Sequence, residues 1–478
     1  MVCMSVSALE EWQFSSEQGE RNYNQALREY PAQVIVDLAA LRDNMRHLVD
    51  ITNREGGPTE VMGVVKADAY GHGLVPSALA ALAGGATWLG VAQAREALAL
   101  RNAGIGVDRA RVLTWVNNPL HAPYDDLIAA DVDLSVATLT AIQKIAEAAR
   151  AVGKPARVHI KVDTGFGRNG FTLAQIDSAI DLLLPLVDEG VFEIVGQWSH
   201  LAVADAPAVG EFVEKTDEQI RVFEEFTSRL HARGIEPRIR HLANTAATLS
   251  RPEIHYDLVR PGVALYGYEA DPAMGTPSKY ELRPAMTLQA QLSSVKNVGA
   301  GEGLSYGRVY VTDEPTSAAI VPVGYADGIH RSASGFNEAG SKHVNKPGAP
   351  VRVMTRDGAR IFHVSGRVCM DQFILDLHGD AENMGVHIGD TVELFGPGRG
   401  EDYLEPTADD WARAAIRSAM RSSPVCATVC RDCMRMRSKC STRRTWASST
   451  RARCCDVPVH RHCMNRREGA QILRKIRR

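Results

Sequence analysis

Several features that mark other classes of protein are missing from this 478-residue chain. No apolar run reaches the roughly 20 residues that a membrane-spanning helix needs. The first residues lack the charged, apolar and small-residue order of a secretory signal. Cysteine is scarce in residues 1–416, which contain only Cys3 and Cys369. We therefore expect a cytoplasmic protein with no membrane partner and no disulfide framework.

Acidic residues are scarce only at the end of the chain. Residues 417–478 hold 3 of the 57 Asp and Glu residues, but 17 of the 54 Lys and Arg residues and seven of the nine cysteines. A zinc site around Cys430-x-x-Cys433 is weakly indicated, because the neighbouring cysteine spacings match no familiar finger. Positive charge alone is an equally weak sign of nucleic-acid binding. The Arg, Cys and Ser bias favours a shifted reading frame instead, so we expect neither a metal nor a nucleic acid.

The remainder of the chain divides into three parts. Residues 1–31 are polar and aperiodic, and the sequence leaves open whether they are a disordered extension or a misplaced start. Residues 32–281 alternate short apolar runs with Ala/Leu/Glu-rich segments of helical spacing, which predicts a (β/α)8 barrel. Residues 282–416 consist of short β-branched runs between Gly, Pro and Asp, which predicts a mostly β domain. A cleft between two such domains is a natural ligand site.

Eight apolar runs supply the strands of the predicted barrel. They are Met62–Val65, Trp88–Ala92, Val112–Val116, Leu134–Val136, Val158–Val162, Ile194–Ser199, Ile239–Ala243 and Leu258–Arg260. An open doubly wound sheet is the alternative, and it would require a G-x-G-x-x-G loop after the first strand. The loop here reads Tyr70-Gly71-His72-Gly73, so the barrel is favoured.

Residue types with catalytic chemistry follow five of these strands directly. In barrels the active site lies at the carboxyl ends of the strands. The residues at these ends are Lys66, Asp163, Arg168, His200, Asn244, Thr245, Arg260 and Gly262. A purely structural barrel has no need to collect a lysine, a histidine and two arginines at one rim.

Each residue also has a structural interpretation. Lys66 could extend its ammonium group past the sheet rim into water. Asp163 could stabilise a turn or cap a helix, and Arg168 could be solvated. A histidine on an apolar strand, such as His200, is more often a hydrogen-bonded core residue than a catalyst.

The short sequence motifs around these residues favour the functional interpretation. V-V-K-A-D-A-Y-G-H-G, K-V-D-T-G-F-G-R-N-G, W-S-H, H-L-A-N-T-A-A and L-V-R-P-G-V-A-L-Y-G occur in order across the barrel. G-L-S-Y-G, G-Y-A-D-G and V-C-M-D-Q follow in the β-domain. Together they resemble the alanine racemases, barrel-type (fold type III) enzymes that use pyridoxal phosphate. The resemblance runs from about Val34 to Trp411 and implies isomerisation of L-alanine and D-alanine, which supplies D-alanine for peptidoglycan.

The resemblance assigns cofactor-binding roles at the barrel rim. Lys66 would form a Schiff base with the cofactor aldehyde. Tyr70, one helical turn further on, would reach the phosphate together with Thr245 and the amides of Gly262 and Val263. His200 and Asn244 would complete this part of the site. Arg260 would face the pyridine nitrogen, and because a guanidinium donates only, that nitrogen would stay unprotonated.

The substrate side of the site is implied in the same way. Lys66 and Tyr306 would be the two bases on opposite faces of the substrate, with Tyr306 contributed by the partner subunit of a homodimer and hydrogen-bonded to His200. Arg168 would hold the substrate carboxylate, and Lys161 matches a position that can carry a carbamate which orients that arginine. The remaining wall of the pocket would come from Tyr325, Met370 and Asp371.

Two departures from the family pattern are visible. Thr245 stands where serine is usual, which keeps the hydroxyl. Beyond Ala415 the expected Tyr-Glu segment, whose tyrosine would bind the cofactor phosphate, is missing. The alternatives left open are a broad-specificity or serine racemase, an amino-acid decarboxylase, a cofactor-binding protein without turnover, and a pseudoenzyme disabled by its tail.

Overall fold

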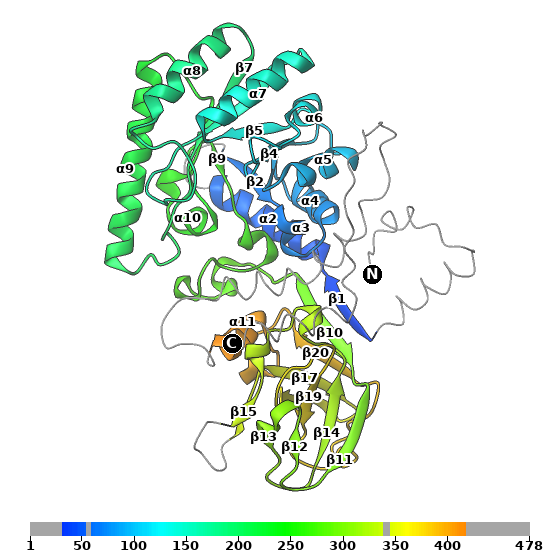
Figure 1. The fold of residues 1–478 in the computed structure, drawn as a ribbon. Helices are drawn as coiled ribbons and strands as arrows, with labels where there is room; N and C mark the ends of the chain where they lie inside the picture. Colours follow the sequence, from blue (N-terminus) through cyan, green and yellow to red (C-terminus); the bar gives the residue numbers. More distant parts are fainter. Residues whose placement is uncertain (1–30, 54–58, 338–344, 417–478) are drawn as a thin grey trace, which may run out of the picture.

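The computed structural model describes residues 31–53, 59–337 and 345–416, which form two domains (Figure 1). The expectations for residues 417–478, and for all but the last residue of 1–31, lie outside the described residues. Within the described ranges, no helix is both long and apolar enough to cross a membrane.

Eight parallel strands of the first domain form one sheet. Their order is β8-β7-β6-β5-β4-β3-β2-β9. They are β2 (Glu60–Val64), β3 (Trp88–Val91), β4 (Arg111–Thr114), β5 (Asp133–Val136), β6 (Ala156–Lys161), β7 (Phe192–Trp198), β8 (Ile239–His241) and β9 (Leu258–Val259). Strands β8 and β9 stand at the two edges of this sheet. A bridge between Asn244, which follows β8, and Arg260, which follows β9, links these edges, so the barrel is nearly closed. The predicted barrel is confirmed, and the open doubly wound sheet is wrong.

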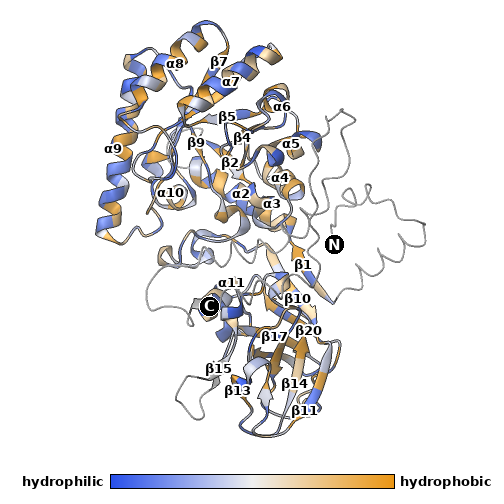
Figure 2. Ribbon diagram, viewed as in Figure 1, coloured by the Kyte–Doolittle hydropathy of each residue, from blue (hydrophilic) through white to orange (hydrophobic). Residues whose placement is uncertain are grey.

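Helices cover the outside of the barrel (Figure 1). They are α2 (Leu38–Asn53), α4 (Leu74–Ala83), α5 (Ala94–Asn102), α6 (Tyr124–Ala129), α7 (Leu139–Val152), α8 (Ile176–Asp188), α9 (Gly210–Ala232) and α10 (Thr245–Ser250). The short segment α3 (Lys66–Tyr70) is instead a turn that follows β2. In α7, Thr138 caps the first turn, Gly153 ends the helix in the left-handed conformation, and one face is buried. Figure 2 shows the corresponding hydrophilic and hydrophobic bands along α9.

Among the described residues, the second domain contains most of the remaining strands and one α-helix. They are β10 (Met286–Gln291), β11 (Ser294–Val298), β12 (Gly303–Leu304), β13 (Tyr310–Val311), β14 (Thr316–Val321), β15 (Phe336–Asn337), β16 (Asn345–Lys346), β17 (Pro350–Thr355), β18 (Gly358–His363), β19 (Phe373–Asp376), β20 (Thr391–Phe395) and α11 (Ala408–Ile416). A separate buried cluster that includes Phe373, Leu394 and Trp411 forms its core. The predicted β-domain of short strands is confirmed.

The first strand, β1 (Ala32–Val36), belongs to the sheet of the second domain. It pairs antiparallel with β10, with Ala32 opposite Ala290 and Val36 opposite Met286. The chain then turns at Asp37, whose carboxylate accepts the first amides of α2 and pairs with Arg283. We expected this strand within the barrel domain. A strand pattern indicates that a strand forms, but it does not identify the sheet that the strand joins.

Candidate active site

Lys66 follows the buried strand β2 and stands at the start of a turn whose backbone is left-handed. Residues 67–70 have φ values of 56°, 54°, 55° and 56°, so four consecutive residues other than glycine adopt the left-handed conformation. Each residue in this conformation costs roughly 1–2 kcal/mol. The turn places Lys66 Nζ 5.8 Å from the centre of the Tyr70 ring. Lys66 and Tyr70 are thus brought together as predicted, but by a left-handed turn rather than an ordinary helical one.

Two carboxylates hold the left-handed turn in place. Glu96, which is buried on α5, accepts the Ala67 amide at 2.6 Å through Oε1 and the amides of Ala92 and Gln93 at 3.0 Å through Oε2. Asp68 accepts the Leu74 amide at 2.7 Å. Hydrogen bonds to an ionised group contribute about 1.5–3 kcal/mol each. These contacts offset the backbone strain, so Glu96 supports the segment that carries Lys66.

Replacing Glu96 by glutamine is expected to lower the free energy of unfolding by about 2–3 kcal/mol, because an amide nitrogen then faces a backbone donor. It should also weaken cofactor binding, since Lys66 and Tyr70 share the affected turn. Urea unfolding and titration with pyridoxal phosphate measure both effects. Arg95→Gln, an exposed change on the same helix, should stay within about 0.5 kcal/mol of the wild type. Equal stability of the two variants would contradict this role.

A small cradle lies where the left-handed turn meets the end of β9. A Cβ atom on Gly262 would lie 2.6 Å from the Tyr70 hydroxyl, so only glycine leaves this space open. The Gly262 amide donates to Thr245 Oγ1 at 2.9 Å, and η3 (Val263–Tyr266) begins directly afterwards. A tyrosine hydroxyl, a threonine hydroxyl and backbone amides are suitable ligands for a phosphate. The four residues predicted to bind the cofactor phosphate therefore lie together.

Gly262→Ala is expected to close this cradle, because the added methyl group would collide with the Tyr70 hydroxyl. We expect the dissociation constant of pyridoxal phosphate to rise by at least about tenfold, or 1.4 kcal/mol. Gly210→Ala is the matched control, since its Cβ would meet nothing within 4 Å at the start of α9. Unchanged cofactor affinity in Gly262→Ala would show that the cradle does not bind the phosphate.

Four cationic side chains gather near the same rim: Lys66, Lys161, Arg168 and Arg260. Arg260 is 5% exposed, and its guanidinium donates from Nη2 to the Ser199 and Leu242 carbonyls at 2.6 and 3.2 Å. Burial, together with the charge of Arg168, lowers the pKa of Arg260 to about 9. Lys161 is also buried, 4.4 Å from the centre of the Trp198 ring. Burial and the nearby Arg168 and Arg260 lower its pKa to about 8. Such a cluster favours anionic ligands.

His200 lies at the end of β7 within this positive field. Its ring packs edge-on against Phe166, with ring centres 5.5 Å apart. Burial lowers its pKa well below the usual value, and the charges of Arg260, Arg168, Lys66 and Lys161 lower it further. The imidazole is therefore neutral at pH 7 and is able to accept a hydrogen bond.

Two predicted residues have clear structural roles. Asp163 Oδ1 accepts the amides of Gly165, Phe166 and Gly167, which shapes the loop that leads to Arg168. Arg168 stacks on the ring of Phe166, with Cζ 4.2 Å from the ring centre. Asn244 uses its carboxamide oxygen to cap α10 by accepting the Ala247 amide. The turn interpretation of Asp163 is confirmed, and Asn244 positions the neighbouring Thr245.

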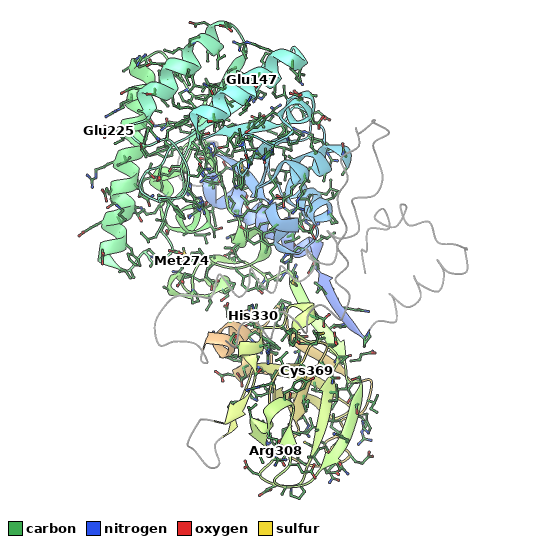
Figure 3. The ribbon with its side chains drawn as sticks, viewed as in Figure 1. Glu147, Glu225, Met274, Arg308, His330 and Cys369 are labelled. Atoms are coloured by element: carbon green, nitrogen blue, oxygen red, sulfur yellow. The ribbon has the colours of Figure 1, made fainter. Side chains whose placement is uncertain are left out.

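The remaining predicted residues form a separate group on the β-domain. Three loops meet there: Tyr325 and Ala326 donate their amides to the Cys369 and Met370 carbonyls at 3.0 and 2.8 Å, and Ser305 Oγ donates to the Arg367 carbonyl at 2.5 Å. Tyr306, Met370 and Tyr325 are 66%, 53% and 39% exposed. Asp371 is exposed as well. Arg308, two residues beyond Tyr306, lies at the end of the β-domain away from the barrel (Figure 3).

Sequence reasoning missed four buried polar residues of the barrel domain. They are Glu96, Asp133, His159 and His241. Glu96 carries a local signal, because it stands at the third position of α5 after Gln93, where a carboxylate commonly bonds back to the helix start. The other three lie on strands far apart in the chain, and no local pattern relates them.

The comparisons with known proteins cover both domains. The family model "Alanine racemase, N-terminal domain" matches residues 36–270, and "Alanine racemase, C-terminal domain" matches residues 285–433. An alanine racemase of Beutenbergia cavernae is 47% identical over 386 residues, which cover 81% of this chain and 93% of that protein.

Solved structures give the same result. Alanine racemase from Streptomyces coelicolor A3(2) is 42% identical with a TM-score of 0.75, and the match covers 86% of this chain and 98% of that chain. Alanine racemase from D-cycloserine-producing Streptomyces lavendulae is 39% identical with a TM-score of 0.72, and the match covers 84% and 94%. A barrel with this rim, followed by this β-domain, defines an amino-acid racemase. The chain belongs to the alanine racemase family. This outcome argues against the decarboxylase and against a cofactor-binding protein without turnover.

Proposed function

We propose that this protein interconverts L-alanine and D-alanine with pyridoxal phosphate, as a homodimer, and so supplies D-alanine for peptidoglycan. The single observation that carries the proposal is the cradle at the left-handed turn. There the Tyr70 hydroxyl faces Gly262 while Lys66 lies on the same turn. This arrangement fits a cofactor that needs a phosphate site and an amine. When bound, pyridoxal phosphate withdraws electrons from the substrate Cα and makes its proton acidic.

Two bases on opposite faces of Cα complete the proposed reaction. Lys66 Nζ removes or returns the proton on one face. Tyr306 of the partner subunit does so on the other. The exposure of Tyr306, and the place of the nearby Arg308 at the end of the β-domain away from the barrel in Figure 3, support a tyrosine that serves a neighbouring chain. Neutral His200 would accept the hydrogen bond of this tyrosine and orient it.

The other rim residues position the reactants. Arg260 would donate to the ring nitrogen, and because it cannot accept a proton there, the nitrogen stays unprotonated. Arg168 would hold the substrate carboxylate by charge-assisted hydrogen bonds. Tyr325, Met370 and Asp371 of the partner subunit would form the far wall of the pocket and limit the size of the substrate side chain.

Assay of the purified full chain with pyridoxal phosphate tests the function. We expect D-alanine to form from L-alanine, and racemisation of L-serine to be slower. Equal rates on serine would favour a broad-specificity racemase. Cofactor binding without any racemisation would instead favour the disabled pseudoenzyme.

Lys161 is expected to carry a carbamate that orients Arg168. A neutral amine attacks the carbon of CO2 and loses a proton, and the new anion would lie among Arg168, Arg260 and Lys66. Because the pKa of Lys161 is about 8, the neutral amine fraction rises with pH. At constant CO2 pressure the carbamate signal in 13C NMR should therefore grow between about pH 7 and pH 9. A signal that persists in Lys161→Gln would assign it elsewhere and contradict this expectation.

A further inference from the structure

Four buried polar side chains form a continuous chain through the middle of the barrel. It begins with Arg260, whose Nη1 lies 3.2 Å from His241 Nδ1. His241 Nε2 lies 2.9 Å from His159 Nδ1, and His159 Nε2 lies 3.2 Å from Asp133 Oδ2. His241, His159 and Asp133 are fully buried. Barrel interiors are filled mainly by branched apolar side chains, so a polar chain in this position needs a reason.

The donors and acceptors in this chain can be assigned in only one direction. Arg260 has only donors, so His241 Nδ1 must accept. Burial lowers the pKa of both histidines, and His241 also lies beside a guanidinium, so both rings are neutral. His241 then carries its proton on Nε2 and donates to His159, which carries its own on Nε2 and donates to the carboxylate. Every hydrogen bond therefore points from the rim toward Asp133.

Asp133 is ionised at the far end of the chain. Burial alone would raise its pKa, but the hydrogen bond from His159 and the charges of Arg111 and Arg157 lower it overall. Arg157 Nε lies 3.1 Å from Oδ1, and Arg111 pairs with the same oxygen. A carboxylate at the end of a hydrogen-bonded chain polarises each member and strengthens the acceptor at the other end.

The surrounding strands are shaped to admit this chain. A Cβ on Gly196 would lie 2.4 Å from His159 Nδ1, so β7 needs glycine beside that ring. The pairing of β6 with β7 shifts register at the same place, between Val158 and His159. The Trp198 ring stacks on His241 at an interplanar angle of 3°. The histidines are therefore held by packing as well as by hydrogen bonds.

We propose that Asp133, His159 and His241 are positioning residues that fix the Arg260 guanidinium for its contact with the ring nitrogen of pyridoxal phosphate. The inference rests on the proposed function. The Ser199 and Leu242 carbonyls hold Nη2 of Arg260, and His241 holds its Nη1. The plane of the guanidinium is therefore fixed from two sides. A misplacement of about 1 Å at such a group can lower the rate by up to about 100-fold.

Two substitutions test the row of hydrogen-bonded side chains from Arg260 to Asp133. Both are made in the full-length protein loaded with pyridoxal phosphate. His159→Phe keeps the ring shape and removes both hydrogen bonds, and Asp133→Asn keeps the shape and removes the charge. Both should shift the visible absorption maximum of the bound cofactor, because its ring nitrogen meets a differently placed donor. Both should lower kcat for alanine about 10-fold to 100-fold while KM changes less than about threefold, since the substrate contacts remain.

Thr227→Val is the matched control. It removes a buried hydrogen bond between Thr227 on α9 and Gln197 on β7, and neither residue belongs to the chain from Arg260 to Asp133. We expect a lower melting temperature with an unchanged absorption maximum and kcat. If His159→Phe and Asp133→Asn behave like this control, or if neither folds, the chain is structural and the inference is wrong. Failure of the wild type to bind the cofactor or to racemise alanine would overturn the proposed function instead.

Discussion

Replacing Lys66 by alanine is expected to lower the rate of alanine racemisation by at least about 10⁴-fold. A positioned base alone contributes about 10²–10⁴-fold, and the loss of the amine that binds the cofactor adds to this. Lys66 stands directly before the strained left-handed turn of residues 67–70, which holds it at the rim. The rate is measured as D-alanine formed from L-alanine. Borohydride treatment followed by mass spectrometry should label the Lys66 peptide of the wild type only.

Lys144→Ala is the control for this variant. Lys144 is partly exposed on α7 and pairs with Glu147, an interaction that contributes little to stability. Its rate and its borohydride label should equal those of the wild type. Retention of more than a hundredth of the activity in Lys66→Ala would remove this lysine from the proposed mechanism.

Tyr306→Phe is the second change with a large expected effect. We expect racemisation to fall by about 10²–10⁴-fold, because the phenyl ring keeps the shape of the loop but cannot carry a proton. Exchange of the α-proton with deuterated solvent should persist for one enantiomer only, since Lys66 still serves its own face. Proton NMR of L-alanine and of D-alanine in deuterated buffer distinguishes the two exchange rates.

Tyr403→Phe is the matched control for the tyrosine. Tyr403 belongs to the same domain and is 57% exposed, close to the 66% of Tyr306. Its removal should leave both exchange rates unchanged. If Tyr306→Phe slows the exchange of both enantiomers equally, the tyrosine is not the base of one face.

The barrel was predictable because apolar runs and helical spacing repeat regularly between residues 60 and 260. All eight predicted strands correspond to β2–β9. The partner of β1 was not predictable, because its contact with β10 joins residues at least 250 positions apart in the sequence. Short strands such as β12 and β15 were missed, since two residues carry no periodicity.

Site residues were predictable where they lie within one short sequence motif. They were not predictable where their contacts join residues far apart in the sequence. Lys66 and Tyr70 are close in sequence, yet nothing in Ala67-Asp68-Ala69 indicates a left-handed turn, which depends on the carboxylate of Glu96. The partners His159 and His241 are 82 residues apart, and only the closed barrel brings them together.

The central claim is that Lys66 of one chain and Tyr306 of the partner subunit form one site. Mixing the inactive Lys66→Ala and Tyr306→Phe proteins, with dissociation and reassociation, tests it most directly. Random pairing makes half of the dimers mixed, and each mixed dimer holds one intact site and one doubly defective site. The mixture should therefore recover about a quarter of the wild-type racemase activity. No recovery, although mixed dimers are detected by native mass spectrometry, would contradict a site shared between subunits.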